Sequence, residues 1–206
     1  MSNAGADGVA ALNLHEVARR VGVSAQALYK YFPSKTGLYD ALYALAVRRY
    51  FEGIALIWRE TPPTWDRVAA WFTYNLTFAQ EQPELYQLWM ERPVPGFVPS
   101  PQSLAENYKA APALHAALDE LVAAGVIRSD VPLDRLRDLL IAVLHGVTSM
   151  HLANEPDLPV GSGRFGGLLP TVMTAFESGL APPRGASSAA GHAESVGPHE
   201  PAGERG

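Results

Sequence analysis

The sequence lacks cysteine, and it also lacks any long apolar run. Without thiols the chain can form no disulfide bond, no thiolate metal site and no cysteine nucleophile. No apolar stretch approaches the ~18 residues of a membrane-spanning helix. The N-terminus lacks the charged-then-apolar layout of a secretory signal. These absences predict a soluble, cytoplasmic protein with no membrane partner.

Basic residues are also scarce, with 16 Lys and Arg against 21 acidic residues and a net charge of −5. This balance excludes a histone-like protein that covers nucleic acid by bulk charge. The charge is unevenly distributed, because residues 1–49 carry a net +3 and the remainder carries −8. A slightly basic end on an acidic body suits a protein that touches DNA with one end, although an ordinary helical surface permits the same charge.

What the chain does contain is helical periodicity, and hydrophobic residues make up 48% of it. Leu136, Leu140, Val143, Leu144 and Val147 recur at three- and four-residue steps, as on one face of a helix. Prolines and glycines bound further predicted helices at 64–82, 83–90, 103–124 and 168–179, and predicted loops at 92–101 and 161–167. The sequence therefore predicts an all-α fold.

The first part of the chain predicts two short helices joined by a tight turn, at 14–21 and 25–32. Gly22 is expected to end the first helix and Ser24 to cap the second, with Val23 as a buried turn residue. Pro33 stops the second helix, because the residue before a proline avoids helical angles. This arrangement is typical of a helix-turn-helix, whose second helix enters the DNA major groove.

Polar side chains on the outward face of this unit are candidates for DNA contact. Gln26 can pair with adenine, and Lys30 can read guanine or contact a phosphate. The N-terminus of a third helix, beginning at Lys35, adds backbone N–H donors for phosphate. The predicted DNA-binding residues are His15, Ser24, Ala25, Gln26, Tyr29, Lys30, Tyr31 and Lys35.

Residues 14–38 read LHEVARRVGVSAQALYKYFPSKTGL and resemble the DNA-binding signature of the tetracycline-repressor (TetR) family of bacterial regulators. The pairs Val17-Ala18, Leu28-Tyr29, Tyr31-Phe32 and Ser34-Lys35 and the triplet Gly22-Val23-Ser24 fall in register with it. Leu144-His145-Gly146 also looks like the Trp-His-Gly (WHG) motif of one subgroup, with Leu replacing Trp, and Glu84-Leu-Tyr86 before a Trp-Met pair is similar to that subgroup.

The resemblance implies a transcriptional regulator, most commonly a repressor, that binds a palindromic double-stranded DNA operator as a homodimer. A small hydrophobic or aromatic effector would release it. The implied domains are a helix-turn-helix domain at 1–46, a helical regulatory and dimerisation domain at 47–181 and a disordered tail at 182–206. The tail prediction has its own physical basis, since residues 182–206 hold almost no large apolar side chains.

One departure concerns the helix that precedes the helix-turn-helix in the family. Only seven residues precede Gly8, and they are not typical of a helical core. The first helix is therefore predicted to be missing or truncated. This leaves an alternative in which the chain is a small-molecule-binding helical dimer that has lost DNA binding.

Aromatic residues gather between positions 58 and 108, where an effector pocket is expected. Trp71, Asn75 and Phe78 share one helix face, although for any single residue plain core packing is the simpler explanation. The loop at 92–101 either gates this cavity or is a solvent loop. The predicted ligand-binding residues are Trp71, Tyr74, Asn75, Phe78, Trp89, Tyr108 and His145.

The last two long helices carry more apolar residues than one inner face needs. In the family such helices form a two-fold dimer interface, and the alternative is burial within one subunit. The predicted interface residues are Leu139, Val143, Val147, Leu169, Val172, Met173 and Phe176.

No enzyme class is supported by the motifs. The sequence contains no Gly-x-Ser-x-Gly elbow, no phosphate loop and no His-Glu-x-x-His. His145 and His151 are six residues apart, which does not match the spacing of a helical zinc pair. We therefore expect no catalytic residue, no metal and no cofactor.

Overall fold

The computed structural model describes residues 13–183, apart from the side chain of Ala111. Within this range the chain forms helices and loops and no strand, which confirms the predicted all-α class. The predictions for a missing first helix and for a disordered tail beyond Pro183 lie outside the described residues.

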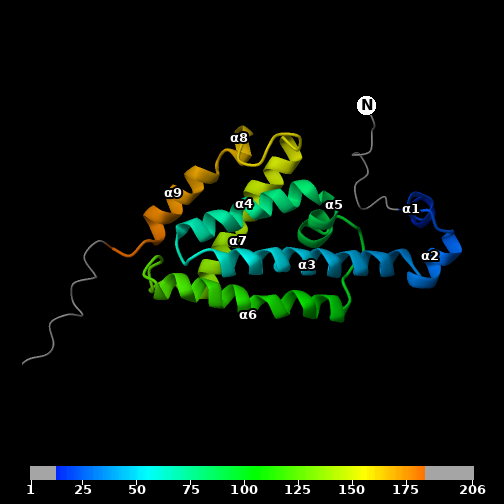
Figure 1. Cartoon of the computed structure of the whole chain (residues 1–206), viewed down its shortest axis with the longest axis horizontal. Helices are drawn as coiled ribbons and strands as arrows, with labels where there is room; N and C mark the ends of the chain where they lie inside the picture. Colours follow the sequence, from blue (N-terminus) through cyan, green and yellow to red (C-terminus); the bar gives the residue numbers. More distant parts are fainter. Residues whose placement is uncertain (1–12, 184–206) are drawn as a thin grey trace, which may run out of the picture.

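The helices form a small unit at one end of an elongated body (Figure 1). The small unit contains α1, α2 and the start of α3, and the remaining elements pack along the rest of α3. The elements in chain order are α1 (Leu14–Val21), α2 (Ala25–Tyr31), α3 (Lys35–Glu60), α4 (Trp65–Glu81), α5 (Pro83–Tyr86), the π-helix η2 (Gln87–Glu91), α6 (Pro101–Ala123), α7 (Leu133–Asn154), α8 (Gly163–Gly166) and α9 (Leu169–Leu180).

The helix boundaries follow from local signals in the sequence. Gly22 ends α1 with a left-handed φ of 74°, which glycine adopts without steric cost. The Ser24 and Ser34 hydroxyls accept hydrogen bonds from Ala27 N and Gly37 N and so cap α2 and α3.

Two local predictions were wrong. The predicted loop at 161–167 contains the helical turn α8, because the Glu155 carboxylate accepts hydrogen bonds from Arg164 N and Phe165 N and caps it. Val23 is 44% exposed rather than buried. It lies at the α1–α2 turn, outside the interior that other apolar side chains of the small unit fill.

The longest helix joins the two parts of the molecule. α3 has 26 residues, a length of about 39 Å at 1.5 Å per residue. Near its start, Leu38 packs with Leu14, Ala18 and Leu28 in the interior of the small unit. Further along, its side chains belong to the large core of the body. One continuous helix therefore contributes side chains to both interiors.

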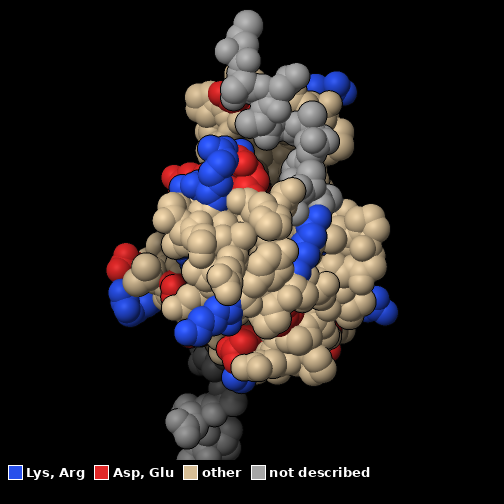
Figure 2. Space-filling view, turned by 90° about the vertical axis from the view of Figure 1, so that its right-hand side faces the viewer, with Lys and Arg blue, Asp and Glu red and all other residues tan. Residues whose placement is uncertain are grey.

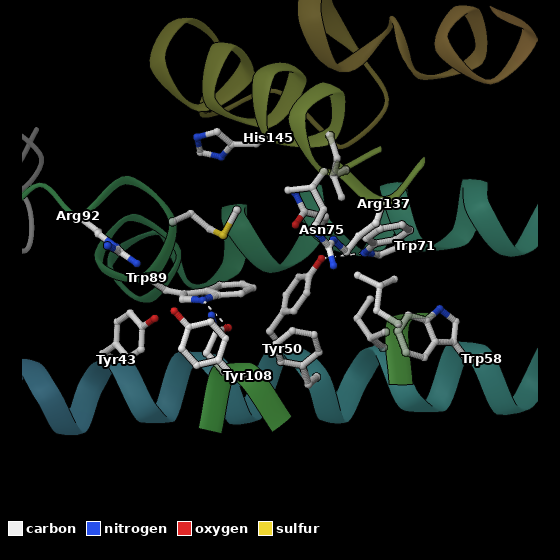
Figure 3. A pocket seen from close by; sticks show the side chains of 17 residues that line it. Tyr43, Tyr50, Trp58, Trp71, Asn75, Trp89, Arg92, Tyr108, Arg137 and His145 are labelled. Carbon is white, nitrogen blue, oxygen red and sulfur yellow. Dashed lines mark hydrogen bonds between the residues drawn. The ribbon is translucent and has the colours of Figure 1, made fainter. Parts of the chain in front are cut away.

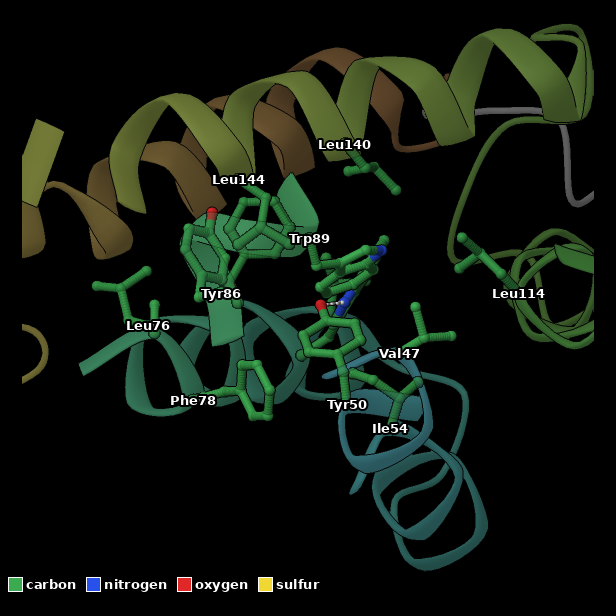
Figure 4. Close-up of a cluster of buried hydrophobic side chains, with 14 of the residues drawn as sticks. Val47, Tyr50, Ile54, Leu76, Phe78, Tyr86, Trp89, Leu114, Leu140 and Leu144 are labelled. Atoms are coloured by element: carbon green, nitrogen blue, oxygen red, sulfur yellow. Dashed lines mark hydrogen bonds between the residues drawn. The ribbon is translucent and has the colours of Figure 1, made fainter. Parts of the chain in front are cut away.

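The body has a continuous aromatic and aliphatic core between α3, α4, α6, α7 and α9 (Figure 4). Leu140 and Leu144 of α7 face Tyr86 and Trp89 across this core. At the edge, the buried Arg67 donates to Thr61 O and, over 2.6 Å, to the Glu120 carboxylate, and so ties the α3–α4 turn to α6. The body is thus a rigid frame around the cavity described below.

Candidate functional sites

The small unit presents the predicted DNA-contacting residues at the end of the molecule. Gln26, Tyr29 and Lys30 are exposed on α2, Tyr31 is 76% exposed, and Ala25 is half-buried against the interior of the unit. Figure 2 looks onto this end and shows basic and acidic side chains interspersed over a mostly uncharged surface. DNA contact here would depend on a few well-placed groups rather than on a strongly basic surface.

Neighbouring residues hold this surface in place. The exposed His15 of α1 packs edge-on against Tyr29, with ring centroids 6.0 Å apart. Lys35, exposed at the start of α3, lies over the Tyr39 ring at 5.5 Å. The Ser24 hydroxyl accepts the capping hydrogen bond of α2, and its own O–H is still available as a donor.

Two arginines of α1 are partly neutralised. The Glu16 carboxylate accepts hydrogen bonds from Arg19 and Arg20 at 2.6–2.9 Å. These bonds, the one from Arg19 foremost, lower the pKa of Glu16 to about 2. Glu16 therefore stays ionised and keeps both arginines paired, and Lys30 on α2 is better placed than either of them for phosphate contact.

The body contains a cavity of about 490 Å³, which falls within the roughly 300–1,000 Å³ of small-molecule sites. Figure 3 shows side chains from α3, α4, η2, α6 and α7 converging on it. Its walls are mainly aromatic and aliphatic. The lining residues are Tyr43, Tyr50, Phe51, Ile54, Trp58, Trp71, Asn75, Trp89, Met90, Arg92, Asn107, Tyr108, Leu114, Arg137, Ile141, Leu144 and His145.

Five of the seven predicted ligand-binding residues line this cavity, namely Trp71, Asn75, Trp89, Tyr108 and His145. Tyr74 does not, because its ring lies against Gly53 and its hydroxyl donates to Arg49 O. Phe78 is buried elsewhere in the core, edge-on to Tyr50 at 5.4 Å. Tyr74 and Phe78 thus lie outside the lining of this cavity, although Phe78 shares a helix face with Trp71 and Asn75.

α3 provides a wall of the cavity that was not predicted from the sequence. Tyr43, Tyr50 and Ile54 follow one another at helical spacing and line the cavity together. That spacing was visible in the sequence as a buried stripe of α3. Arg92 and Arg137 had no comparable signal, because a single arginine in a sequence is most simply interpreted as solvent-exposed.

Hydrogen bonds between side chains fix the geometry of the walls. Trp71 Nε1 donates to Tyr50 Oη at 2.9 Å, and Asn75 Nδ2 donates to Thr148 Oγ1 at 2.8 Å. Tyr86 Oη and His145 Nδ1 are 3.0 Å apart. Burial raises the pKa of Tyr86 to about 12, so its phenol is neutral, and the direction of its hydrogen bond with the imidazole follows the His145 tautomer. His145 is therefore both a cavity residue and a hydrogen-bonded one.

The segment between η2 and α6 connects the cavity to α3. Arg92 at its start lines the cavity, and Phe97 packs on Tyr39 with ring centroids 5.6 Å apart. At its end, the Asp40 carboxylate accepts hydrogen bonds from Ser100 N, Ser100 Oγ and Ser103 Oγ at 2.7–2.9 Å. Burial alone would raise the pKa of Asp40, but these bonds outweigh it and hold the pKa below its usual value. The segment is therefore tied to α3 rather than free in solvent.

The predicted dimer residues divide into two groups. Leu139 is 43% exposed, and Val143, Val147, Val172 and Met173 are half-buried against the core of their own subunit. Leu169 and Phe176 are only 8% exposed, because they pack inside their own subunit. Phe176 packs edge-on against Phe72 of α4 at 5.9 Å, because the inner face of α9 covers α4.

Two further questions for the described residues concern metal ions and membranes. Between residues 13 and 183, no three His, Asp or Glu side chains gather as a metal ion would require. No helix in that range is both long and apolar enough to cross a membrane. The arrangement provides an exposed helix-turn-helix surface and an apolar cavity, which are suited to binding.

Two family models match the sequence. The one described as "Bacterial regulatory proteins, tetR family" matches residues 4–42, and "Tetracyclin repressor-like, C-terminal domain" matches residues 68–165. Among curated proteins, nucleoid occlusion factor SlmA of Yersinia pestis and of Yersinia pseudotuberculosis is 33% identical over 82 residues, or 40% of this chain and 41% of that protein. The matched region thus spans about two fifths of these relatives.

Solved structures share the fold over most of the chain. A protein with unknown function from a Rhodococcus species is 25% identical with a TM-score of 0.66, covering 83% of this chain and 86% of that one. The transcriptional regulator FadR from Bacillus subtilis, in complex with stearoyl-CoA, is 14% identical with a TM-score of 0.65, covering 84% and 91%. The TetR family regulator PfmR from Thermus thermophilus is 19% identical with a TM-score of 0.59, covering 83% and 90%.

Proposed function

Because the chain belongs to the TetR family of bacterial transcriptional regulators, we propose that it is a cytoplasmic, ligand-responsive repressor that binds a palindromic operator as a homodimer. Family membership makes it a DNA-binding regulator rather than an enzyme. The finer proposal depends on one observation. The cavity of about 490 Å³ is lined by α3, and the same helix continues into the DNA-contacting unit.

The proposed switch works through the position of α3. Operator half-sites lie one helical turn, ~34 Å, or a multiple of it apart. A small pivot of the small unit in each subunit therefore moves the two recognition helices out of register with the half-sites. An effector that fits the cavity better in one orientation of α3 shifts the population toward that orientation. The bonds from Ser100 and Ser103 to Asp40 join the wall of the cavity to α3 three residues before Tyr43.

The homodimer proposal is supported by an exposed apolar stripe on α7. Leu139 and Met150 are 43% and 45% exposed, and Gly146 between them has no atom within 4 Å of where a Cβ would lie. A glycine in an exposed helix interior costs up to about 1 kcal/mol, and a closely approaching partner helix accounts for it. Gly146→Arg should yield a monomer in light scattering, whereas Ala55→Arg on the exposed face of α3 should not. A dimer that survives Gly146→Arg contradicts this interface.

The test of the repressor is an electrophoretic shift on the promoter region beside the protein's own gene. We expect a specific shift that Lys30→Ala on α2 weakens about tenfold, through loss of a base or phosphate contact. Lys109→Ala is the matched control, because Lys109 is exposed on α6 and paired with Glu106. No shift with the full chain would overturn the repressor and leave a ligand-binding dimer that does not bind DNA.

A further inference from the structure

The cavity has two chemically different ends along α3. Its α3 wall runs from Tyr43 to Trp58, a span of about 22 Å at 1.5 Å per residue. Figure 3 shows Arg92 and Tyr108 beside Tyr43 at one end, and Trp58 and Trp71 at the other. The other end is lined by Trp58, Trp71 and Leu114, with Arg137 beside Trp71 and paired with Asp134 and Asp138. A molecule that fills this cavity would therefore have a polar end and an apolar body.

A buried hydroxyl at the polar end has no hydrogen-bond partner. Tyr43 is 0% exposed, and its Oη makes no hydrogen bond although it lines the cavity. Burial raises the pKa of this phenol, while the charge of the nearby Arg92 and the approach of its guanidinium to the hydroxyl act in the opposite direction. The phenol is therefore a neutral O–H donor that lacks an acceptor, which is a costly state for a buried group.

Arg92 supplies an uncompensated positive charge at the same end. It makes no ion pair with any acidic residue in the described part of the chain. The neighbouring carboxylates are engaged elsewhere, since Asp40 accepts from Ser100 and Ser103, and Glu91 accepts from Ser149 Oγ at 3.0 Å. A guanidinium has only donors. Tyr43 and Arg92 together thus present donors toward the cavity.

The backbone at Arg92 is unusual in a way that favours a binding role. It has a φ of 50°, the only positive value among non-glycine residues in the described range, and it follows the π-helix η2. Pro93 opposes a right-handed helical conformation at Arg92. Strained residues and π-helical turns concentrate at functional sites, where they direct a side chain that a regular helix would place elsewhere.

The other arginine of the cavity is already neutralised. Arg137 donates to the Asp134 carboxylate at 3.1 Å and to that of Asp138 at 2.8–2.9 Å. It therefore offers a matched comparison, because both arginines line the same cavity and only Arg92 lacks a carboxylate partner in the described part of the chain.

We propose that the effector is an amphipathic monocarboxylic acid whose carboxylate is bound by Arg92 and Tyr43, with its apolar body lying along α3 toward Trp58 and Trp71. This inference rests on the proposed effector cavity and specifies its ligand class. One cation and one hydroxyl donor match one negative charge. A phosphate ester, with nearly two charges, would leave excess charge beside apolar walls.

The experiment measures binding to the ligand-free full chain with three matched pairs, namely 4-phenylbutyrate, decanoate and 2-naphthoate, each against its primary amide. Three of the four tryptophans, Trp58, Trp71 and Trp89, line the cavity, so intrinsic fluorescence reports occupancy and calorimetry gives the affinity. For a charge-assisted hydrogen-bond pair we expect at least one acid to bind about tenfold or more tighter than its amide.

Three variants locate this preference. Arg92→Gln and Tyr43→Phe should each reduce acid affinity about tenfold and amide affinity much less, because the neutral amide forms no charge-assisted hydrogen bond. Arg137→Gln should alter the acid-to-amide ratio by less than about threefold, since its charge is already paired. Circular dichroism melting checks that each variant is folded, and Arg92 is exposed enough to be replaced without disturbing the core.

The outcomes separate the two proposals. Equal binding of acids and amides, tighter binding of 4-phenylbutyl phosphate than of 4-phenylbutyrate, or a preference that survives Arg92→Gln would overturn the monocarboxylate inference and leave the effector cavity standing. Binding of none of the six compounds would count against the effector cavity itself.

Discussion

The DNA-contacting unit and the body differ sharply in how much they bury. Four side chains, Leu14, Ala18, Leu28 and Leu38, form the described interior of the small unit, whereas the body has a core of aromatic and aliphatic residues contributed by most of its helices. A small interior supports little local stability. The contrast indicates that the small unit is easily repositioned, while the body keeps the shape of its cavity.

The largest expected effect comes from removing one apolar side chain from each region. Leu28→Ala and Leu140→Ala should each cost about 3 kcal/mol, but in different places. Leu28→Ala should abolish the DNA shift and hydrogen-exchange protection in α1 and α2, with ligand binding intact. Leu140→Ala should lower the thermal midpoint of the body. If Leu28→Ala lowers the body midpoint as much as Leu140→Ala, the two regions do not differ as we infer.

A second comparison adds a methyl group at two helix glycines. At Gly53 the new Cβ would lie 2.1 Å from Tyr74 Oη and 2.3 Å from its ring, so Gly53→Ala should destabilise the body by about 2 kcal/mol. At Gly146 no atom of the same subunit lies within 4 Å of the new Cβ, so within one subunit Gly146→Ala should raise helix stability by about 0.5–1 kcal/mol. In the proposed dimer the partner helix packed on this glycine would oppose that gain. Chemical denaturation of both variants measures the difference, and equal effects would contradict the close Gly53–Tyr74 packing.

The stability that the Asp40 hydrogen bonds contribute should depend on pH. The pKa of Asp40 is held below its usual 3.8 in the folded chain, so its contribution to stability is present above pH ~4 and is lost as pH falls further. Asp40→Asn should cost about 1–2 kcal/mol near neutral pH and progressively less below pH ~4. Urea unfolding across this range tests the expectation, with Asp157→Asn in the exposed α7–α8 connection as control. A pH-independent cost would refute the role of the carboxylate charge.

The smallest effect contrasts two cavity tyrosines in the empty protein. Tyr50→Phe removes the acceptor of the Trp71 Nε1–H bond and should cost about 1 kcal/mol. Tyr43→Phe removes a buried hydroxyl without a partner and should leave stability unchanged or raise it by up to about 1 kcal/mol. Opposite signs in thermal melting are the expected result. A destabilised Tyr43→Phe would mean that the Tyr43 hydroxyl already has a partner in the unliganded protein.

Much of the fold could be predicted from local signals, because capping serines, Gly22 and the prolines act within a few residues of the helix ends they define. The features that were not predicted depend on contacts between residues that are distant in the sequence. The turn α8 depends on the carboxylate of Glu155, which lies outside the turn in the sequence. The Tyr74 side chain packs against Gly53, where no Cβ excludes it, and therefore does not line the cavity.

The cavity was predictable only in part for the same reason. Periodicity assigns Trp71, Asn75 and Phe78 to one face of α4, but it does not show how far along this face the cavity extends. Trp71 and Asn75 line the cavity, whereas Phe78 packs in the core against Tyr50. Arg92 enters the site through a left-handed backbone after a π-helix, which no periodic pattern predicts.

The most direct test of the account follows DNA release and cavity occupancy in one titration. The acid that binds most tightly is added to the protein on labelled promoter DNA, with DNA anisotropy and tryptophan fluorescence recorded together. We predict that DNA is released over the same concentration range in which the tryptophans respond, and that Arg92→Gln shifts both curves about tenfold. If the acid saturates the cavity while the DNA stays fully bound, the result contradicts the central claim that the ligand site of the body controls DNA binding by the small unit.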